Sequence, residues 1–175
     1  MTLSSSNQVE IEYYVLTPSM LGQFVRNKRW GIEAYYRKLY GIEKPKTKQM
    51  DEGEKLHEKY GFTNEKKFVK KFQIMPNVYV ELRGIPDKID ENGRPWEAKT
   101  TDGTFVPESK IEGAKTQLLC YLFLMDKDYG FLEFISRTTG KPLEAMRTVV
   151  FRDDKKLFSI IKNFIYELRK QKQLI

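Results

Sequence analysis

The hydrophobic pattern of this chain changes its period near residue 68, and that change restricts the fold more than any other feature. Before it, apolar side chains recur at helical spacing, as from Ile32 to Leu39. After it, they alternate with polar ones, as from Val78 to Leu82, which is typical of a strand. The predicted order is helices at 18–27, 30–40 and 48–60, strands at 68–75, 78–83, 87–90 and 94–101, a helix at 107–126, strands at 131–138 and 145–151, and a helix from 154.

This order predicts an α/β or α+β domain, with a mixed β-sheet flanked by helices and a helical section at the N-terminus. A chain of 175 residues has about the length of one domain, and it contains no repeat or low-complexity linker. We therefore expect a single domain over residues 1–175, with a helical section at 1–61 and a mixed-sheet core with a final helix at 62–175. Thr17 is expected to cap the first helix, and Gly61 to end the third.

The charge balance points to an anionic partner. Lys and Arg number 31 against 24 Asp and Glu, which gives a net charge of +7. Such an excess attracts polyanions, most often nucleic acid, although a solvated lysine-rich surface is the plainer explanation. The longest apolar run, 118–125, is shorter than the roughly 20 residues of a membrane helix, and the N-terminus lacks a secretory pattern. We expect a cytoplasmic protein that binds no membrane.

Two carboxylates are predicted to meet in a hairpin that runs from residue 84 to residue 101. A two-residue turn at Asn92-Gly93 would turn Asp87 away from Glu97. A three-residue loop over 91–93, with Gly93 in the left-handed conformation, places Asp87 directly opposite Glu97 instead. Lys99 shares the face of Glu97 because the two residues are two apart on a strand.

The three-residue loop is favoured by the chemistry of these side chains. Asp87 lies between Ile85 and Ile89 on the face expected to be buried, where an unpaired carboxylate is unfavourable. A second carboxylate beside it raises that cost unless a cation neutralises both, and oxygen ligands suit Mg²⁺ or Mn²⁺. An exposed hairpin with ordinary ion pairs is the alternative, because Glu-x-Lys alone is a common motif.

Two helices carry further candidates. Gly53 stands one turn before His57, the only histidine of the chain, and a helical glycine suggests close packing there. Close approach of this helix to the sheet would make His57 a third ligand, whereas a surface histidine is the alternative. On the helix at 107–126, Gln117 and Tyr121 share one face, as substrate contacts or as ordinary boundary residues. An apolar stripe is expected to hold that helix to the sheet, formed by Ile111, Ala114, Leu118, Leu122 and Met125.

Together these motifs resemble a known family. Gly-x-x-x-His, Gly-x-x-Asp, Glu-x-Lys and Gln-x-x-x-Tyr follow one another as in the RecB-type branch of the PD-(D/E)XK nucleases, over nearly the whole chain from Pro18 onward. The nearest likeness is to the RecB-like nucleases associated with CRISPR systems and archaeal viruses. The resemblance implies a restriction-endonuclease-like core. It also implies metal ligation by His57, Asp87, Glu97 and the Ala98 carbonyl, a catalytic Lys99, and a substrate-side pair of Gln117 and Tyr121.

The chain departs from this family at one point. The CRISPR-associated members usually bind an iron–sulfur cluster through four cysteines, whereas Asn27 stands at the first of those positions here. The only cysteine, Cys120, lies in an apolar run and is expected to be in the core. We therefore predict no iron–sulfur cluster and no disulfide within the chain.

The resemblance implies a Mg²⁺- or Mn²⁺-dependent deoxyribonuclease that acts on single-stranded DNA or DNA ends. The implied setting is DNA processing, recombination or CRISPR-type spacer acquisition, with protein partners of such a complex. A nucleic-acid-binding or assembly subunit with a weak or idle site is the alternative, and a Holliday-junction or restriction-type nuclease is a third. Basic residues near the hairpin are predicted to contact DNA, namely Lys66, Lys67, Lys70, Lys71 and Lys110.

Overall fold

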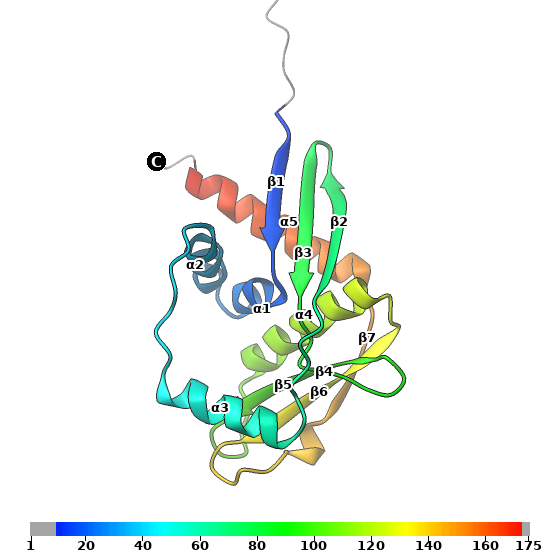
Figure 1. Ribbon diagram of the computed structural model, residues 1–175. Helices are drawn as coiled ribbons and strands as arrows, with labels where there is room; N and C mark the ends of the chain where they lie inside the picture. Colours follow the sequence, from blue (N-terminus) through cyan, green and yellow to red (C-terminus); the bar gives the residue numbers. More distant parts are fainter. Residues whose placement is uncertain (1–9, 173–175) are drawn as a thin grey trace, which may run out of the picture.

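The computed structural model describes residues 10–172 and has the predicted mixture of helices and strands (Figure 1). The helices are α1 (Pro18–Arg26), α2 (Lys28–Leu39), α3 (Lys48–Lys59), α4 (Glu108–Met125) and α5 (Asp154–Lys172), with a 3₁₀ turn at Glu144–Met146. The strands are β1 (Glu12–Leu16), β2 (Phe68–Met75), β3 (Val78–Gly84), β4 (Lys88–Ile89), β5 (Pro95–Thr101), β6 (Tyr129–Ser136) and β7 (Thr148–Phe151).

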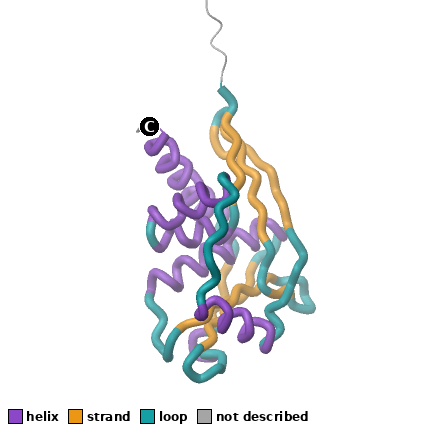
Figure 2. Tube along the Cα trace, turned by 60° about the vertical axis from the view of Figure 1, so that its left-hand side comes forward, coloured by secondary structure: helices purple, strands orange, loops and turns teal. Residues whose placement is uncertain are grey.

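The strands form two mixed sheets. The first has the order β1-β3-β2, with β1 parallel and β2 antiparallel to β3. The second has the order β4-β5-β6-β7, in which only β5 and β6 are parallel. The prediction of mixed-sheet architecture flanked by helices is confirmed, with its strands divided between two sheets that Figures 1 and 2 show above and below α4.

Helix α4 is the centre of the molecule. It contacts strands of both sheets as well as α1 and α5. Nearly every side chain from Gly113 to Leu124 is buried, including polar Thr116 and Gln117. The single apolar stripe predicted for this helix was therefore too narrow, because structure surrounds the helix on several sides. Cys120 is fully buried in it, in the core as expected.

The N-terminal section is not purely helical, which corrects the prediction for residues 1–61. Strand β1 precedes the helices, and Tyr14 and Leu16 from it are buried beside β3. The helix boundaries agree closely with the sequence. The Thr17 side chain accepts a hydrogen bond from the Met20 N–H at the start of α1, and Gly61 follows α3 in the left-handed conformation.

Two predicted strands are shorter than expected. The strand predicted at 87–90 is reduced to Lys88–Ile89, because the chain bends away from β3 after Gly84, where a bend was predicted. The strand predicted at 145–151 begins at Thr148, since the residues before it form the 3₁₀ turn. Among the helices of residues 10–172, none has the length and apolar character needed to cross a bilayer.

Candidate active site

The hairpin between β4 and β5 has the predicted three-residue loop. The Asp90 N–H donates to the Arg94 carbonyl (3.0 Å), and Gly93 has a φ of 72°. Lys88 therefore pairs with Trp96, and this register sets Asp87 opposite Glu97 as expected.

The surroundings of Asp87 differ from the prediction. Ile85 was expected to lie on the buried side, but it is 45% exposed because the chain leaves β3 just before it. Asp87 itself is half-buried, and its Oδ2 accepts a hydrogen bond from the Ala98 N–H (2.8 Å). The Asp87 carboxylate is thus fixed against the backbone of β5, next to Glu97.

Glu97 is the most unusual polar side chain of the site. Only 2% of the side chain is exposed, and its Oε1 contacts the Lys99 ammonium. Its other oxygen, Oε2, is the one buried side-chain polar atom among the described residues that has no hydrogen-bond partner. Burial raises the pKa of Glu97 to about 8, and the Asp87 carboxylate acts in the same direction against the opposing charge of Lys99. Two carboxylates therefore meet in a buried place with one oxygen unsatisfied.

Lys99 bridges β5 and α4. Besides Glu97, its ammonium donates to the Gln117 side-chain oxygen (3.2 Å). Burial tends to lower the pKa of Lys99, but the Glu97 and Asp87 carboxylates outweigh it, so the net direction is upward and Lys99 is a cation. Of the predicted residues, the structure thus brings Asp87, Glu97, Lys99 and Gln117 together.

Gln117 is positioned by a close crossing of α1 and α4. A Cβ at Gly22 would lie 2.7 Å from the Gly113 carbonyl oxygen and 2.8 Å from Gln117 Cγ. Only glycine allows the two helices to approach this closely. Sequence analysis did not identify Gly22, although a glycine inside a predicted helix was a signal that could have found it.

Tyr121, one turn further along α4, is buried at the point where β3 ends. A Cβ at Gly84 would lie 2.8 Å from the Tyr121 ring, so glycine is required where the chain passes it. Burial raises the pKa of Tyr121 well above its usual value, and the carboxylates of Glu97 and Asp87 add to the rise. Tyr121 also lines a pocket of about 300 Å³, together with Arg83 and Lys67.

His57 lies on α3, which packs over β5. A Cβ at Gly53 would lie 3.1 Å from Thr100 Oγ1, which confirms the predicted close approach. His57, Ala98 and Lys99 line one pocket. Burial lowers the pKa of His57, although Asp87 raises it, so the imidazole is neutral at pH 7. Within residues 10–172, no three His, Cys, Asp or Glu side chains lie close enough together to hold a metal ion, so His57 does not complete a ligand set with the two carboxylates.

This pocket, of about 600 Å³, is basic. Lys44, Lys110 and Arg137 line it beside Lys99, with Glu54 as its acidic side chain. Arg137 is held by the Thr100 hydroxyl (2.9 Å), and the Lys110 ammonium donates to the Thr100 carbonyl. Arg137 escaped sequence analysis because its place depends on the pairing of β6 with β5, which nothing in the sequence indicated.

The predicted DNA-contacting lysines are scattered. Lys110 lines the pocket of His57, and Lys67 lines the pocket of Tyr121. Lys66 lies over the Phe68 ring (5.3 Å to its centroid). The other two lie on β2 and are paired with acidic groups, Lys70 with Asp126 at the end of α4 (2.9 Å) and Lys71 with Glu81 on β3 (3.3 Å).

The fold is similar to that of several solved structures, such as the three that follow, whereas no protein-family model and no curated protein matches the sequence. SSO0001 aligns with a TM-score of 0.59 and 16% identity, over 91% of this chain and 79% of that one. A phage-related exonuclease from Haemophilus somnus 129PT aligns with a TM-score of 0.55 and 13% identity, over 93% of this chain and 96% of that one. LHK-Exo, solved in complex with dAMP, aligns with a TM-score of 0.50 and 14% identity, over 89% of this chain and 88% of that one.

These alignments cover almost the whole described chain, so they concern its complete architecture. The chain has the predicted mixed α/β architecture, with α4 between two mixed sheets, and it shares this fold with the aligned structures. At such low identity the similarity concerns the fold, and the chemistry has to be argued from the site itself.

Proposed function

Starting from a fold shared with two exonucleases, we propose that this protein is a metal-dependent nuclease that hydrolyses DNA phosphodiester bonds. The observation that carries the proposal is the unpartnered, buried Oε2 of Glu97 beside Asp87 and Lys99. A buried carboxylate oxygen without a partner destabilises the fold by about 1–3 kcal/mol, so a function is the natural reason to retain it.

The residues present fit a hard divalent cation. Asp87 and Glu97 supply two carboxylates, and Mg²⁺ is commonly bound by one or two carboxylates together with water and substrate phosphate. The Ala98 carbonyl is the further protein ligand we propose, with His57 outside the set, and water and substrate phosphate would fill the remaining positions. When bound there, the cation lowers the pKa of a coordinated water and stabilises charge on the phosphate.

The protein's own groups would orient the substrate. Lys99, held by Gln117 and Glu97, has an ammonium that can donate to a phosphate oxygen or to the attacking water. Lys44, Lys110 and Arg137 make the pocket wall attractive to a polyanion. Tyr121, one turn beyond Gln117 on α4, is proposed to contact the substrate through the pocket that it lines with Arg83 and Lys67.

The finer assignment rests on the motifs. We propose that the chain is RecB-like, that it acts on single-stranded DNA or DNA ends, and that it works in DNA processing or CRISPR-type spacer acquisition with protein partners. A DNA-binding subunit with an idle site is the second candidate, favoured by the lack of a three-side-chain ligand group within the described residues.

The test is incubation of end-labelled single- and double-stranded DNA with Mg²⁺, Mn²⁺ or a chelator. We expect cleavage with either cation and none with the chelator, and a loss of about a hundredfold or more in Lys99→Ala. The matched control is Lys162→Ala, an exposed lysine on α5 remote from the site, which should cleave normally. DNA binding without cation-dependent cleavage, unchanged in Asp87→Asn, would instead support the idle subunit.

A further inference from the structure

A second basic pocket adjoins the proposed active site. It has a volume of about 350 Å³ and is lined by Gln23, Arg26, Trp30, Glu33, Arg37 and Lys44. Lys44 also lines the pocket of His57 and Lys99, so the two pockets meet at this residue. Lys44 lies in the loop that runs from α2 to α3 along one side of the molecule (Figure 1).

The centre of this second pocket is an exposed aromatic ring. Trp30 is 46% exposed on the first turn of α2, and the Arg26 guanidinium lies over its ring, 5.4 Å from the centroid. The corner between α1 and α2 is rigid, because a Cβ at Gly31 would lie 2.4 Å from Phe24 Cβ. The fold therefore presents a large ring to solvent at a fixed position.

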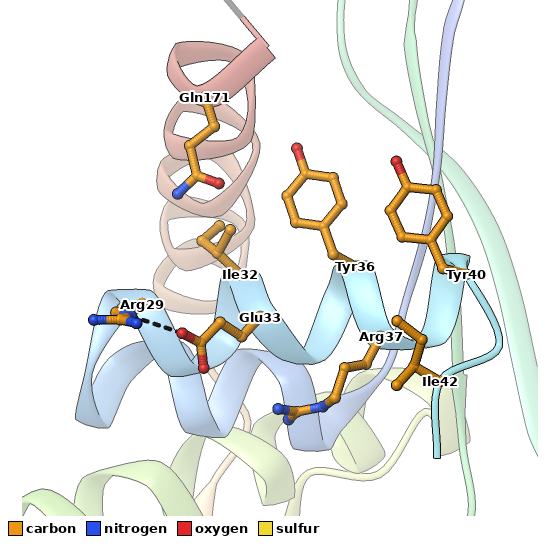
Figure 3. A pocket seen from close by; sticks show the side chains of 8 residues that line it. All are labelled: Arg29, Ile32, Glu33, Tyr36, Arg37, Tyr40, Ile42 and Gln171. Atoms are coloured by element: carbon orange, nitrogen blue, oxygen red, sulfur yellow. Dashed lines mark hydrogen bonds and ion pairs between the residues drawn. The ribbon is translucent and has the colours of Figure 1, made fainter. Parts of the chain in front are cut away.

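The cations of this pocket are free to bind a ligand. Arg26, Arg37 and Lys44 take part in none of the ion pairs found among residues 10–172. The acidic residue of the pocket, Glu33, is paired with Arg29 (2.6 Å), which does not line the pocket. Figure 3 shows a neighbouring pocket on α2, which Glu33 and Arg37 also line, and marks the pair between Arg29 and Glu33. The pocket thus has uncompensated positive charge around an exposed indole.

Arg26 links this pocket to the pocket of His57 and Lys99. A Cβ at Gly113, one turn before Gln117, would lie 2.7 Å from Arg26 Cδ. The Arg26 side chain therefore crosses α4 close to the place where Gln117 accepts the hydrogen bond of Lys99. Its charge also lowers the pKa of Lys110, after the larger effects of burial and of Arg137. One basic path therefore leads from Lys99 to Trp30.

We propose that Trp30, with Arg26, Arg37 and Lys44, is a binding subsite for the unpaired strand of the DNA substrate, in which a base stacks on the indole while the cations contact phosphates. This inference rests on the proposed nuclease function and adds that the substrate enters the proposed active site as an unpaired strand. An aromatic platform among backbone-binding cations is the arrangement that single-stranded nucleic acid requires. A base in an intact duplex is already stacked on its neighbours, so it cannot use this platform.

The test measures binding without cleavage. The full chain, with a chelator present, is titrated with a short oligothymidylate while tryptophan fluorescence is followed. The chain has two tryptophans, so the Trp96→Phe variant is used, in which Trp30 is the remaining one. We expect saturable quenching by the oligonucleotide and none by a blunt duplex. Trp30→Ala should weaken binding by about five- to a hundredfold, and Trp30→Phe should retain most of the affinity.

Tyr166 provides the matched control, because it is 57% exposed on α5 with the Lys170 ammonium over its ring (4.4 Å) and lies outside the pocket. Tyr166→Ala should bind the oligonucleotide like the unmodified chain. Unquenched Trp30 at saturation, or equal affinity in Trp30→Ala, would overturn the subsite even if the protein cleaves DNA. Quenching in a protein that never cleaves would retain the subsite and reject the nuclease.

Discussion

Replacing Glu97 by glutamine should stabilise the protein while abolishing its proposed activity. The glutamine oxygen can still accept from Lys99 as Glu97 Oε1 does. Its amide nitrogen takes the place of the unpartnered Oε2 and can donate to the Asp87 carboxylate. The repulsive contact between the buried Glu97 carboxylate and the half-buried Asp87 carboxylate thereby becomes a hydrogen bond.

The size of the effect follows from these two changes. Satisfying a buried polar atom is worth about 1–3 kcal/mol, and one kcal/mol shifts the melting temperature of a domain of this size by about 2–4 °C. We expect Glu97→Gln to melt about 3–10 °C above the unmodified chain. Because the folded pKa of Glu97, about 8, exceeds its unfolded value, the folded state binds more protons and loses stability as the pH rises toward 8. The gap between the two proteins should therefore be widest near pH 8 and narrow toward pH 5.

The assay is thermal unfolding with a chelator across this pH range, repeated with Mn²⁺. The cation should raise the melting temperature of the unmodified chain and leave that of Glu97→Gln unchanged, since a ligand stabilises only a state that binds it. Glu133 on the neighbouring β6 is the control, because it is equally buried but both of its oxygens accept from Arg147 (2.6 and 3.0 Å). Glu133→Gln should lose about 1–2 kcal/mol.

One result would refute this reasoning. If Glu97→Gln and Glu133→Gln destabilised the protein alike with the chelator present, the unpartnered oxygen of Glu97 would carry no energetic penalty, and the argument for a cation there would fail.

Three further predictions concern positions that support the site. Gly22→Ala should destabilise the fold by about 1–3 kcal/mol and weaken cleavage, because its Cβ would displace Gln117; unfolding that matches the unmodified chain would contradict this. Gly53→Leu should reduce cleavage by pushing α3 away from Thr100, whereas Gly53→Ala, whose Cβ would lie 3.1 Å from Thr100 Oγ1, should remain active in the same assay. The Arg83 guanidinium lowers the pKa of Glu81 to about 2, so the stability that this carboxylate contributes is present above pH 4.5 and lost toward pH 2. In acid unfolding experiments, Glu81→Gln should not show this loss of stability.

The hairpin could be predicted from sequence because its geometry is set by neighbours along the chain. A loop ending in Gly93 takes one register, and that register decides whether Asp87 lies opposite Glu97. The same holds for the cap at Thr17 and for the close approach of α3 at Gly53, where one residue type has a single structural use.

Features that depend on contacts distant in sequence could not be predicted this way. The pairing of β1 with β3 joins residues more than sixty positions apart. Residues 12–16 are rich in strand-favouring types, a signal that sequence analysis did not use, but nothing local indicates their partner strand. The burial of α4 on several sides also arises from the surrounding sheets and helices. The unbroken apolar run 118–125 was a signal of it, but that run does not identify the neighbours. The crossing at Gly22 is of the same kind, because its partner, Gly113, belongs to another helix.

The contrast between Glu97 and Glu133 shows which part of the site stability alone does not explain. Both are buried glutamates on adjacent parallel strands of one sheet, one register position apart. Glu133 is satisfied by Arg147, which directly precedes the neighbouring strand β7, as a buried charge in a stable fold requires. Glu97 has instead a lysine on one oxygen, a second carboxylate beside it and no partner for the other oxygen. Since the fold can satisfy such a group and does so at the next strand, the missing partner at Glu97 is best explained by a ligand from outside the chain.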